Sequence, residues 1–165
     1  MNLMRGEYGR QNNMNSEIQH KLANFYKKGI QLEKEKRYDE ALLVWQEGYS
    51  LIPEPRWRFD ISSEFLAAMG DVYFLRKGMY REAYECFDTM RGYGGFGNPY
   101  VMLRMGECCL ELGDMESAAE YLRRAWLEGG KEIFEPDENG EDDGRKYYEF
   151  LLKQLNIETD GDGRK

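Results

Sequence analysis

The sequence holds little of what enzymes and metal sites use. Its 165 residues include one histidine, three cysteines and four prolines. His20 alone would have to serve any Ser–His or Cys–His pair, so an activated nucleophile is not expected. The cysteines Cys86, Cys108 and Cys109 are odd in number and have no C-x-x-C spacing, which argues against a disulfide framework and a zinc site. We therefore expect no enzyme activity, no cofactor and no metal.

Long apolar runs and a basic surface are also missing. There is no stretch of about 18 apolar residues, so no transmembrane helix is expected, and the N-terminus lacks the apolar core of a signal peptide. The net charge is −8, from 23 Lys and Arg against 31 Asp and Glu. Basic residues alternate with acids along the predicted helices, which argues against a nucleic-acid partner. We expect a cytoplasmic protein with no membrane partner and leave its oligomeric state open.

What the sequence does hold is an internal repeat of paired helices. A glycine lies midway along each first helix, and an alanine in each second helix precedes an aromatic residue or Leu by three or four positions. The marker glycines are Gly29, Gly70 and Gly106, and the marker alanines are Ala41, Ala83 and Ala118. Both series advance together at spacings of roughly 35 to 42 residues, which is typical of a solenoid. Because glycine weakens a helix, its recurrence predicts close approach of the paired helices.

These residues resemble the tetratricopeptide (TPR) family, whose unit is a helix–turn–helix of about 34 residues. The matching residues are Phe25, Gly29, Leu32, Tyr38, Ala41, Trp45 and Pro53 in the first unit; Leu66, Gly70, Tyr73, Tyr80, Ala83 and Phe87 in the second; and Met102, Gly106, Gly113, Ala118, Leu122 and Ala125 in the third. The second unit has one residue more than the family spacing, which we place in the turn at Arg76-Lys77-Gly78.

The resemblance implies an all-α fold, a helical-repeat solenoid of three TPR-like helix pairs with a C-terminal capping helix. We place the repeats at about 22–55, 63–95 and 99–130 and the capping helix at about 145–155, within one TPR-like domain over 16–157. Residues 1–15 and 158–165 are expected to be disordered, and Met14 is an alternative start to Met1. Between the second and third units, Asn98 is predicted to cap the next helix, with Pro99 in its first turn.

In the TPR family, partners lie in a concave groove lined by the first helices. Transferring the lining positions through the repeat gives eight candidate binding residues: Tyr26, Lys27, Ile30, Asp71, Phe74, Tyr100, Arg104 and Glu107. Family members that hold chaperone C-terminal carboxylates use a set of Lys, Asn and Arg in this groove. Only Arg104 falls where that set has a base, which argues against such a carboxylate clamp.

Two further segments are candidate contact surfaces. An insertion after the first unit contains Arg56, Trp57 and Arg58, residue types that are favoured at binding hot spots. The alternative is that this insertion extends the next helix backward and docks on the first helix pair.

The second segment is the acidic C-terminal end, since residues 131–165 carry most of the net charge. We expect a solvated loop at 137–144. Its acids Asp137, Glu138, Asp142 and Asp143 are candidates for contact with a basic partner.

Beyond the repeat, three stretches resemble a group of short, stand-alone bacterial TPR proteins. They run from Trp45 to Pro55, from Gly94 to Arg104, and from Glu132 to Phe134. Members of that group are often encoded beside polymorphic toxins, including Rhs-type toxins, as presumed immunity proteins. The resemblance implies a protein that binds and silences one toxin domain. The alternative is a general TPR adaptor that binds a peptide or protein segment in its concave groove.

Overall fold

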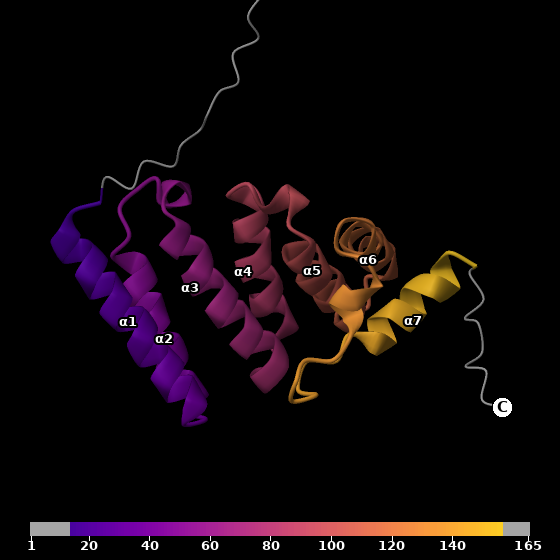
Figure 1. The fold of residues 1–165 in the computed structure, drawn as a ribbon, viewed down its shortest axis with the longest axis horizontal. Helices are drawn as coiled ribbons and strands as arrows, with labels where there is room; N and C mark the ends of the chain where they lie inside the picture. The colour runs from indigo at the N-terminus through magenta and orange to yellow at the C-terminus, as the bar shows by residue number, and fades with distance from the viewer. Residues whose placement is uncertain (1–13, 157–165) are drawn as a thin grey trace, which may run out of the picture. The chain divides into compact units, whose positions relative to one another are not determined.

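The computed structural model describes residues 14–156, and within them every regular element is helical. The α-helices, labelled in Figure 1, are α1 (Ser16–Lys34), α2 (Tyr38–Ser50), α3 (Asp60–Asp71), α4 (Tyr80–Gly92), α5 (Pro99–Glu111), α6 (Met115–Gly129) and α7 (Arg145–Gln154). Short helical segments are η1 (Arg56–Arg58), η2 (Val72–Lys77), η3 (Gly95–Gly97) and η4 (Lys131–Phe134). The prediction of an all-α fold of paired helices with a C-terminal helix is confirmed. The prediction of disorder over 1–15 is wrong at its last two residues, since Met14 is buried and Asn15 caps α1. Residues 1–13 and 158–165 lie outside the described range, and the choice between Met1 and Met14 as the start stays a prediction.

The chain forms two compact units, whose boundary falls within α3 between Phe65 and Leu66. The N-terminal unit contains α1, α2, η1 and the beginning of α3. The C-terminal unit contains the end of α3 and everything that follows it. The single TPR-like domain over 16–157 stays a prediction.

In the N-terminal unit, α1 and α2 pack together through their small residues. A Cβ atom placed on Gly29 would lie 2.0 Å from Trp45 Nε1, so only glycine leaves room for this indole. The indole is fully buried and donates a hydrogen bond to the Tyr26 carbonyl oxygen at 3.2 Å. Ala41, one turn before Trp45, is fully buried as well. The predicted close approach of the first helix pair is therefore confirmed.

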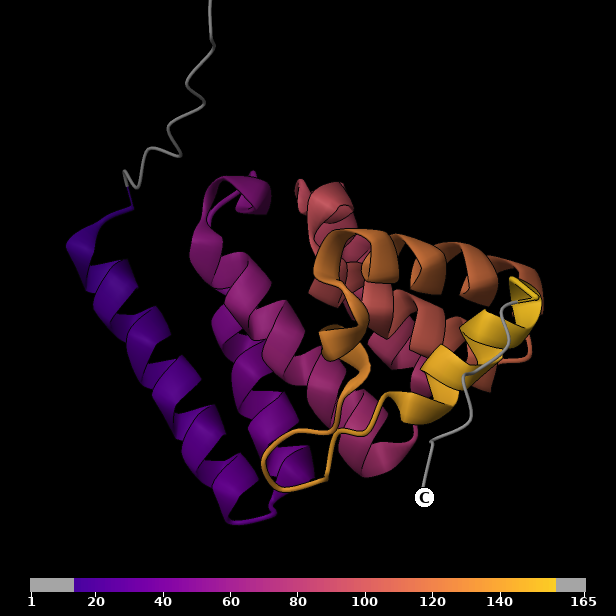
Figure 2. The same ribbon diagram turned by 45° about the vertical axis from the view of Figure 1, so that its right-hand side comes forward.

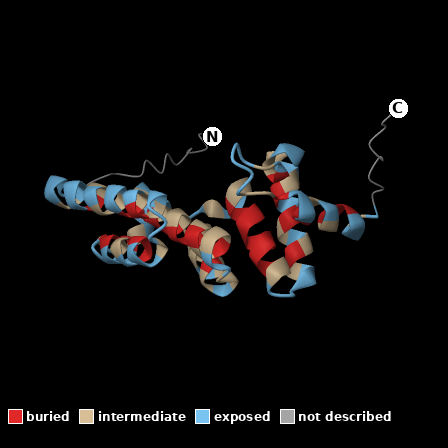
Figure 3. Ribbon diagram, turned by 90° about the horizontal axis from the view of Figure 1, so that it is seen from below, coloured by how far each residue is buried: buried red, intermediate tan, exposed pale blue. Residues whose placement is uncertain are grey.

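The C-terminal unit repeats this contact twice. A Cβ atom on Gly70 would lie 2.6 Å from Phe87 Cζ, and one on Gly106 would lie 2.7 Å from Leu122 Cγ. The helix that is buried most completely is α5, in which every residue from Val101 to Cys109 is buried. Figure 3 shows buried residues along the length of one helix in this unit. Helix α5 is consequently the centre of the unit, between α4 and α6.

The extra residue of the second repeat lies inside a helix, so our placement of it in the following turn was wrong. Helix α3 continues as a π-helical segment from Val72 to Lys77, and Gly78 ends it in the left-handed conformation with φ of 61°. A π-helical turn accommodates one additional residue within a helix and rotates the side chains that follow. Phe74 and Arg76 both belong to this segment, and both contact the site described below.

Two terminal features of α5 and α7 agree with the sequence. The Asn98 side chain accepts a hydrogen bond from the Tyr100 amide at 3.0 Å, with Pro99 in the first turn of α5. Helix α7 packs on α6, and its residues Tyr147, Leu151 and Leu152 are buried. The segment between η4 and α7 is a hairpin-like loop, drawn in orange in Figure 2. No helix among residues 14–156 has the length and apolar composition needed to span a bilayer.

Candidate functional site

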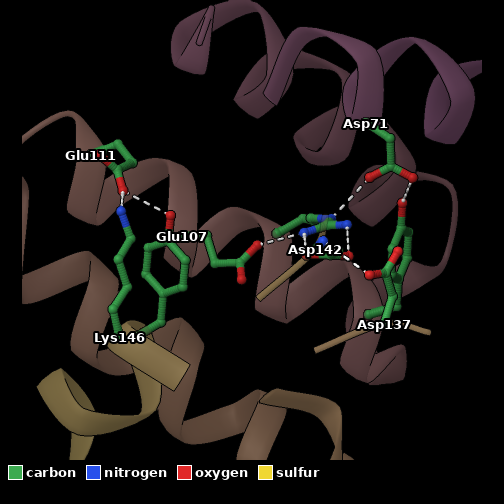
Figure 4. A network of polar contacts seen from close by, with 9 residues as sticks. Asp71, Glu107, Glu111, Asp137, Asp142 and Lys146 are labelled. Atoms are coloured by element: carbon green, nitrogen blue, oxygen red, sulfur yellow. Dashed lines mark hydrogen bonds and ion pairs between the residues drawn. The ribbon is translucent and has the colours of Figure 1, made fainter. Parts of the chain in front are cut away.

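Three carboxylates in the C-terminal unit converge on the guanidinium of Arg104. Arg104 Nε donates to Asp71 Oδ1 at 2.9 Å, and Nη1 donates to Glu107 Oε2 at 2.9 Å. Nη1 and Nη2 also donate to the two oxygens of Asp142, at 3.0 and 2.5 Å. Figure 4 shows the side chains of Asp71, Glu107 and Asp142 within one polar network, with dashed lines for its hydrogen bonds and ion pairs. Arg104 is only 2% exposed, so these contacts replace its hydration shell.

Aromatic rings hold the same guanidinium from its sides. The Arg104 Cζ atom lies 5.4 Å from the centre of the Phe74 ring and 5.5 Å from that of Tyr100. The Tyr100 hydroxyl donates to Asp71 Oδ2 at 2.7 Å, and the Tyr100 ring packs edge-on against Phe87. A guanidinium with this many partners is fixed in orientation, because each contact defines the plane of its donor groups.

The site carries more negative than positive charge. If all three carboxylates were ionised, one arginine would balance only one of three negative charges. Burial raises the pKa of Glu107 to about 7, although the neighbouring Arg104 charge opposes this shift. Glu107 is fully buried, and its Oε1 atom has no hydrogen-bond partner. Burial also raises the pKa of Asp71. The site therefore takes up a proton near neutral pH at the carboxylate that is shielded most from water.

Asp142 comes from a loop that closes on itself, which we call the acidic loop (residues 135–144). The Asp137 Oδ1 atom accepts hydrogen bonds from the Glu141 amide at 2.7 Å and the Asp142 amide at 3.3 Å. The Asp137 amide donates to the Asp142 carbonyl oxygen at 2.9 Å. A second ion pair joins the loop to the π-helical segment, between Arg76 Nη2 and Glu141 Oε2 at 2.6 Å. The loop is thus anchored on the helices by two adjacent carboxylates.

A smaller polar cluster lies one turn along α5. Glu111 Oε1 accepts from Tyr147 at 2.7 Å and pairs with Lys146. Although partial burial opposes it, these contacts lower the pKa of Glu111. Phe74, Tyr80 and Tyr147 line a pocket together with the end of the acidic loop. The beginning of α7 is therefore tied to the same face of α5 as Asp142.

The structure separates the eight groove candidates into two groups. Asp71, Phe74, Tyr100, Arg104 and Glu107 all take part in the Arg104 site, where the chain's own loop covers them.

The other three belong to α1 in the N-terminal unit. Lys27 is exposed and Ile30 is half-buried. The half-buried Tyr26 ring packs edge-on against Phe65 at 5.6 Å.

The insertion forms a separate 3₁₀ segment before α3 and does not extend that helix backward. Trp57 is 49% exposed, and the Arg58 guanidinium lies 5.4 Å from the centre of its ring. Arg56 is half-buried, lies over the Tyr49 ring and pairs with Glu54. Of the two alternatives for this segment, an exposed Trp–Arg surface agrees with the observed geometry.

The four acidic candidates have different surroundings. Asp137 shapes the acidic loop, Asp142 binds Arg104, and Asp143 pairs with Arg145 at 2.5 Å. Glu138 is exposed at the tip. The expected solvated loop is therefore correct for 137–141 and wrong at Asp142, whose side chain is 32% exposed, and at the buried Gly144.

Sequence reasoning named Asp71, Glu107 and Asp142 as candidates but did not predict that they bind Arg104. Asp142 lies 38 residues further along the chain, and no local spacing connects the two positions. One available indication was that Arg104 and Glu107 interrupt an apolar stretch from Val101 to Leu110, where a buried charge needs a partner. Lys146 was also not singled out, and Arg76 was named only as part of a turn. Within residues 14–156 no group of three or more His, Cys, Asp or Glu side chains is arranged to hold a metal ion.

Comparison with known proteins identifies the fold as a TPR-like helical repeat. The chain is similar to PcrH from Pseudomonas aeruginosa, seen in a crystal structure, with a TM-score of 0.56 and 17% sequence identity. The match covers 86% of this chain and 95% of PcrH. No protein-family model matches the chain. No curated protein matches it either.

Proposed function

We propose that this chain is a non-enzymatic protein-binding module. The observation that carries this proposal is the exposed stack of Arg58 on Trp57, which lies outside the repeat and is not needed to fill a core. By contrast, Trp45 is fully buried. Exposed tryptophan and arginine supply much of the binding energy at protein interfaces. A helical-repeat scaffold supports the proposal because such folds present extended surfaces to partners, although the fold alone names no partner.

The test is to measure capture of a partner by surface variants that keep the fold. Trp57→Ala with Arg58→Ala removes the insertion surface, and Lys27→Ala removes an exposed charge from the α1 surface. Leu43→Ala is the matched control, because Leu43 is 65% exposed on α2 and belongs to neither surface. We expect the insertion variant to lose capture by roughly tenfold or more, as for a hot-spot pair. Equal capture by the insertion variant and the Leu43 control would contradict this assignment.

We propose as the specific role an immunity protein that neutralises a cognate bacterial toxin domain. The resemblance of three stretches to immunity-type TPR proteins and the net charge of −8 support it, since an acidic protein is steered toward a basic substrate cleft. If a toxin domain is encoded beside this gene, the experiment is co-expression of the two proteins, with cell survival as the readout. Death of the cells and no complex on size exclusion would contradict immunity and leave the general adaptor.

The acidic loop gives this role a sharper test. Glu138→Gln changes an exposed charge at the loop tip, whereas Asp142→Asn changes one that is bound to Arg104. If the exposed acids of the loop bind a basic cleft of the toxin without rearrangement of the loop, Glu138→Gln should slow association with the toxin. The effect should become smaller in high salt, because exposed charges are screened. Rescue that is independent of salt and of Glu138 would keep immunity and discard the acidic plug.

A further inference from the structure

Arg104 presents the outer edge of its guanidinium to a carboxylate from outside the helical repeat. Asp71 binds Nε, and Glu107 binds Nη1 from within the same helix. Nη1 and Nη2 remain directed together at Asp142, at 3.0 and 2.5 Å. Two parallel N–H donors directed at one carboxylate are the bidentate geometry that favours arginine at recognition sites. The helices thus build a fork for a single carboxylate, and Asp142 fills it.

The loop that supplies Asp142 is held on the helices mainly by charge. Glu141 pairs with Arg76 and Asp142 with Arg104, while residues 137–141 are exposed. Within the loop, Asp137 accepts hydrogen bonds from the Glu141 and Asp142 amides, and at the end of the loop Asp143 pairs with the exposed Arg145 of α7. A segment with few buried apolar contacts opens at low free-energy cost, independently of global unfolding. Opening would release one carboxylate from Arg104 and leave the fork in place.

We propose that the Arg104 fork is the docking position for an acidic side chain, Asp or Glu, of the protein partner, and that Asp142 occupies this position in the free protein. This inference rests on the proposed function, because it assumes a protein partner. Exchange of one carboxylate for another leaves the local charge unchanged, so Asp71 and Glu107 keep their balance with Arg104. A lysine or arginine from the partner would instead have to displace Arg104 from carboxylates that are already bound.

The tether makes Asp142 a strong competitor. A carboxylate attached through a short loop acts at an effective concentration on the order of millimolar. A single free acidic residue cannot displace it at lower concentration, but a partner segment with additional contacts can. The acidic loop would therefore exclude weakly binding acidic peptides and admit a partner that also contacts neighbouring surfaces, such as Phe74 and Tyr80 in the adjoining pocket.

The experiment uses a synthetic peptide with the sequence of residues 135–144 as the probe, added to the isotope-labelled full chain and followed by NMR. In Asp142→Asn the tethered competitor is lost, so we expect shifts at the Arg104 Nε–H and at the Phe74 and Tyr100 amides. We expect the apparent affinity to be roughly tenfold or more above that of the wild type, in which the loop competes. The same peptide with asparagine in place of Asp142 should not bind.

Glu138→Gln is the matched control, because it removes one charge from the same loop at an exposed position. It should behave as the wild type. Circular dichroism checks that each variant is folded. If Asp142→Asn does not fold, the readout moves to the wild type, where excess peptide should accelerate hydrogen exchange at the Glu141 and Asp142 amides.

Three results would overturn the proposal. They are equal peptide affinity of Asp142→Asn and the wild type, equal binding of the asparagine-substituted peptide, and preferential binding of a lysine-rich peptide of the same length. In the wild-type readout, unchanged exchange at saturating peptide would do the same. None of these measurements uses the natural partner, so a negative result leaves the protein-binding proposal standing. Conversely, unchanged partner capture by the insertion variant would contradict the proposed binding surface and leave the fork intact.

Discussion

Lys27 and Arg104 stand two residues before the marker glycines of their helices, and their surroundings are opposite. Lys27 in the N-terminal unit is exposed, whereas Arg104 in the C-terminal unit is 2% exposed and binds three carboxylates. The glycines themselves behave alike, since each is needed for close packing against the second helix. The repeat thus determines how the helices pack, whereas the charged partners of the residue two positions before the glycine differ between the units. At Arg104 two of them come from repeat helices and one, Asp142, from the acidic loop.

The largest expected difference between the two units comes from removing each basic side chain in turn and comparing the loss of stability. Arg104→Ala leaves Asp71, Glu107 and Asp142 without their shared cation, and we expect a loss of about 3–5 kcal/mol in the free energy of unfolding. Lys27→Ala at the equivalent exposed position should change it by less than about 0.5 kcal/mol. Urea denaturation followed by circular dichroism measures both. Similar losses in the two variants would show that burial at this position is not what separates the units.

Because the marker glycines pack alike, replacing them should destabilise the two units by similar amounts. Gly29→Val and Gly106→Val should each cost about 1–3 kcal/mol or more, because a Cβ atom would overlap Trp45 or Leu122. Gly92→Ala is the control, since a Cβ atom added there, at the end of α4, would meet nothing within 4 Å. That change should be neutral or slightly stabilising. An unaltered urea midpoint for Gly106→Val would contradict the close approach of α5 and α6.

The contacts of the glycines and of Arg104 also show what the sequence could and could not predict. The contacts of Gly29 with Trp45 and of Gly106 with Leu122 follow from spacing, because helix periodicity fixes which residues share a face. The environment of Arg104 does not follow, because Asp142 reaches it from a loop with no periodic pattern. The π-helical segment was missed for a related reason: an extra residue can be absorbed in a turn or within a helix, and local spacing does not distinguish them. The repeat pattern therefore predicted the scaffold and only part of the site.

Two glutamates of α5 are expected to change the free energy of unfolding with pH in opposite directions. The pKa of Glu107 is raised to about 7, so the folded state binds this proton more tightly than the unfolded state, and its stabilising effect is lost as pH rises from about 4.5 through 7. Glu111 has a lowered pKa, so its contribution is lost as pH falls below about 4.5. Glu107→Gln should flatten the decline between pH 5 and 8, on the order of 1–3 kcal/mol. Glu111→Gln should leave that decline in place, and a decline that persists in Glu107→Gln would assign the proton to another group.

The smallest expected effect concerns the N-terminal caps of α1 and α5. It tests whether these caps contribute equally to stability in the two units, as the marker glycines are expected to do. Asn15 accepts a hydrogen bond from the Glu17 amide at 2.7 Å, and Asn98 accepts one from the Tyr100 amide at 3.0 Å. Alanine at either position removes one cap and should cost about 1 kcal/mol or less. Because Asn98 begins the helix that carries Arg104, its loss would exceed that of Asn15 only if the cap also positions the Arg104 site. Equal losses, with an unchanged pH dependence in Asn98→Ala, would show that the carboxylates and rings around Arg104 hold the site without help from the cap.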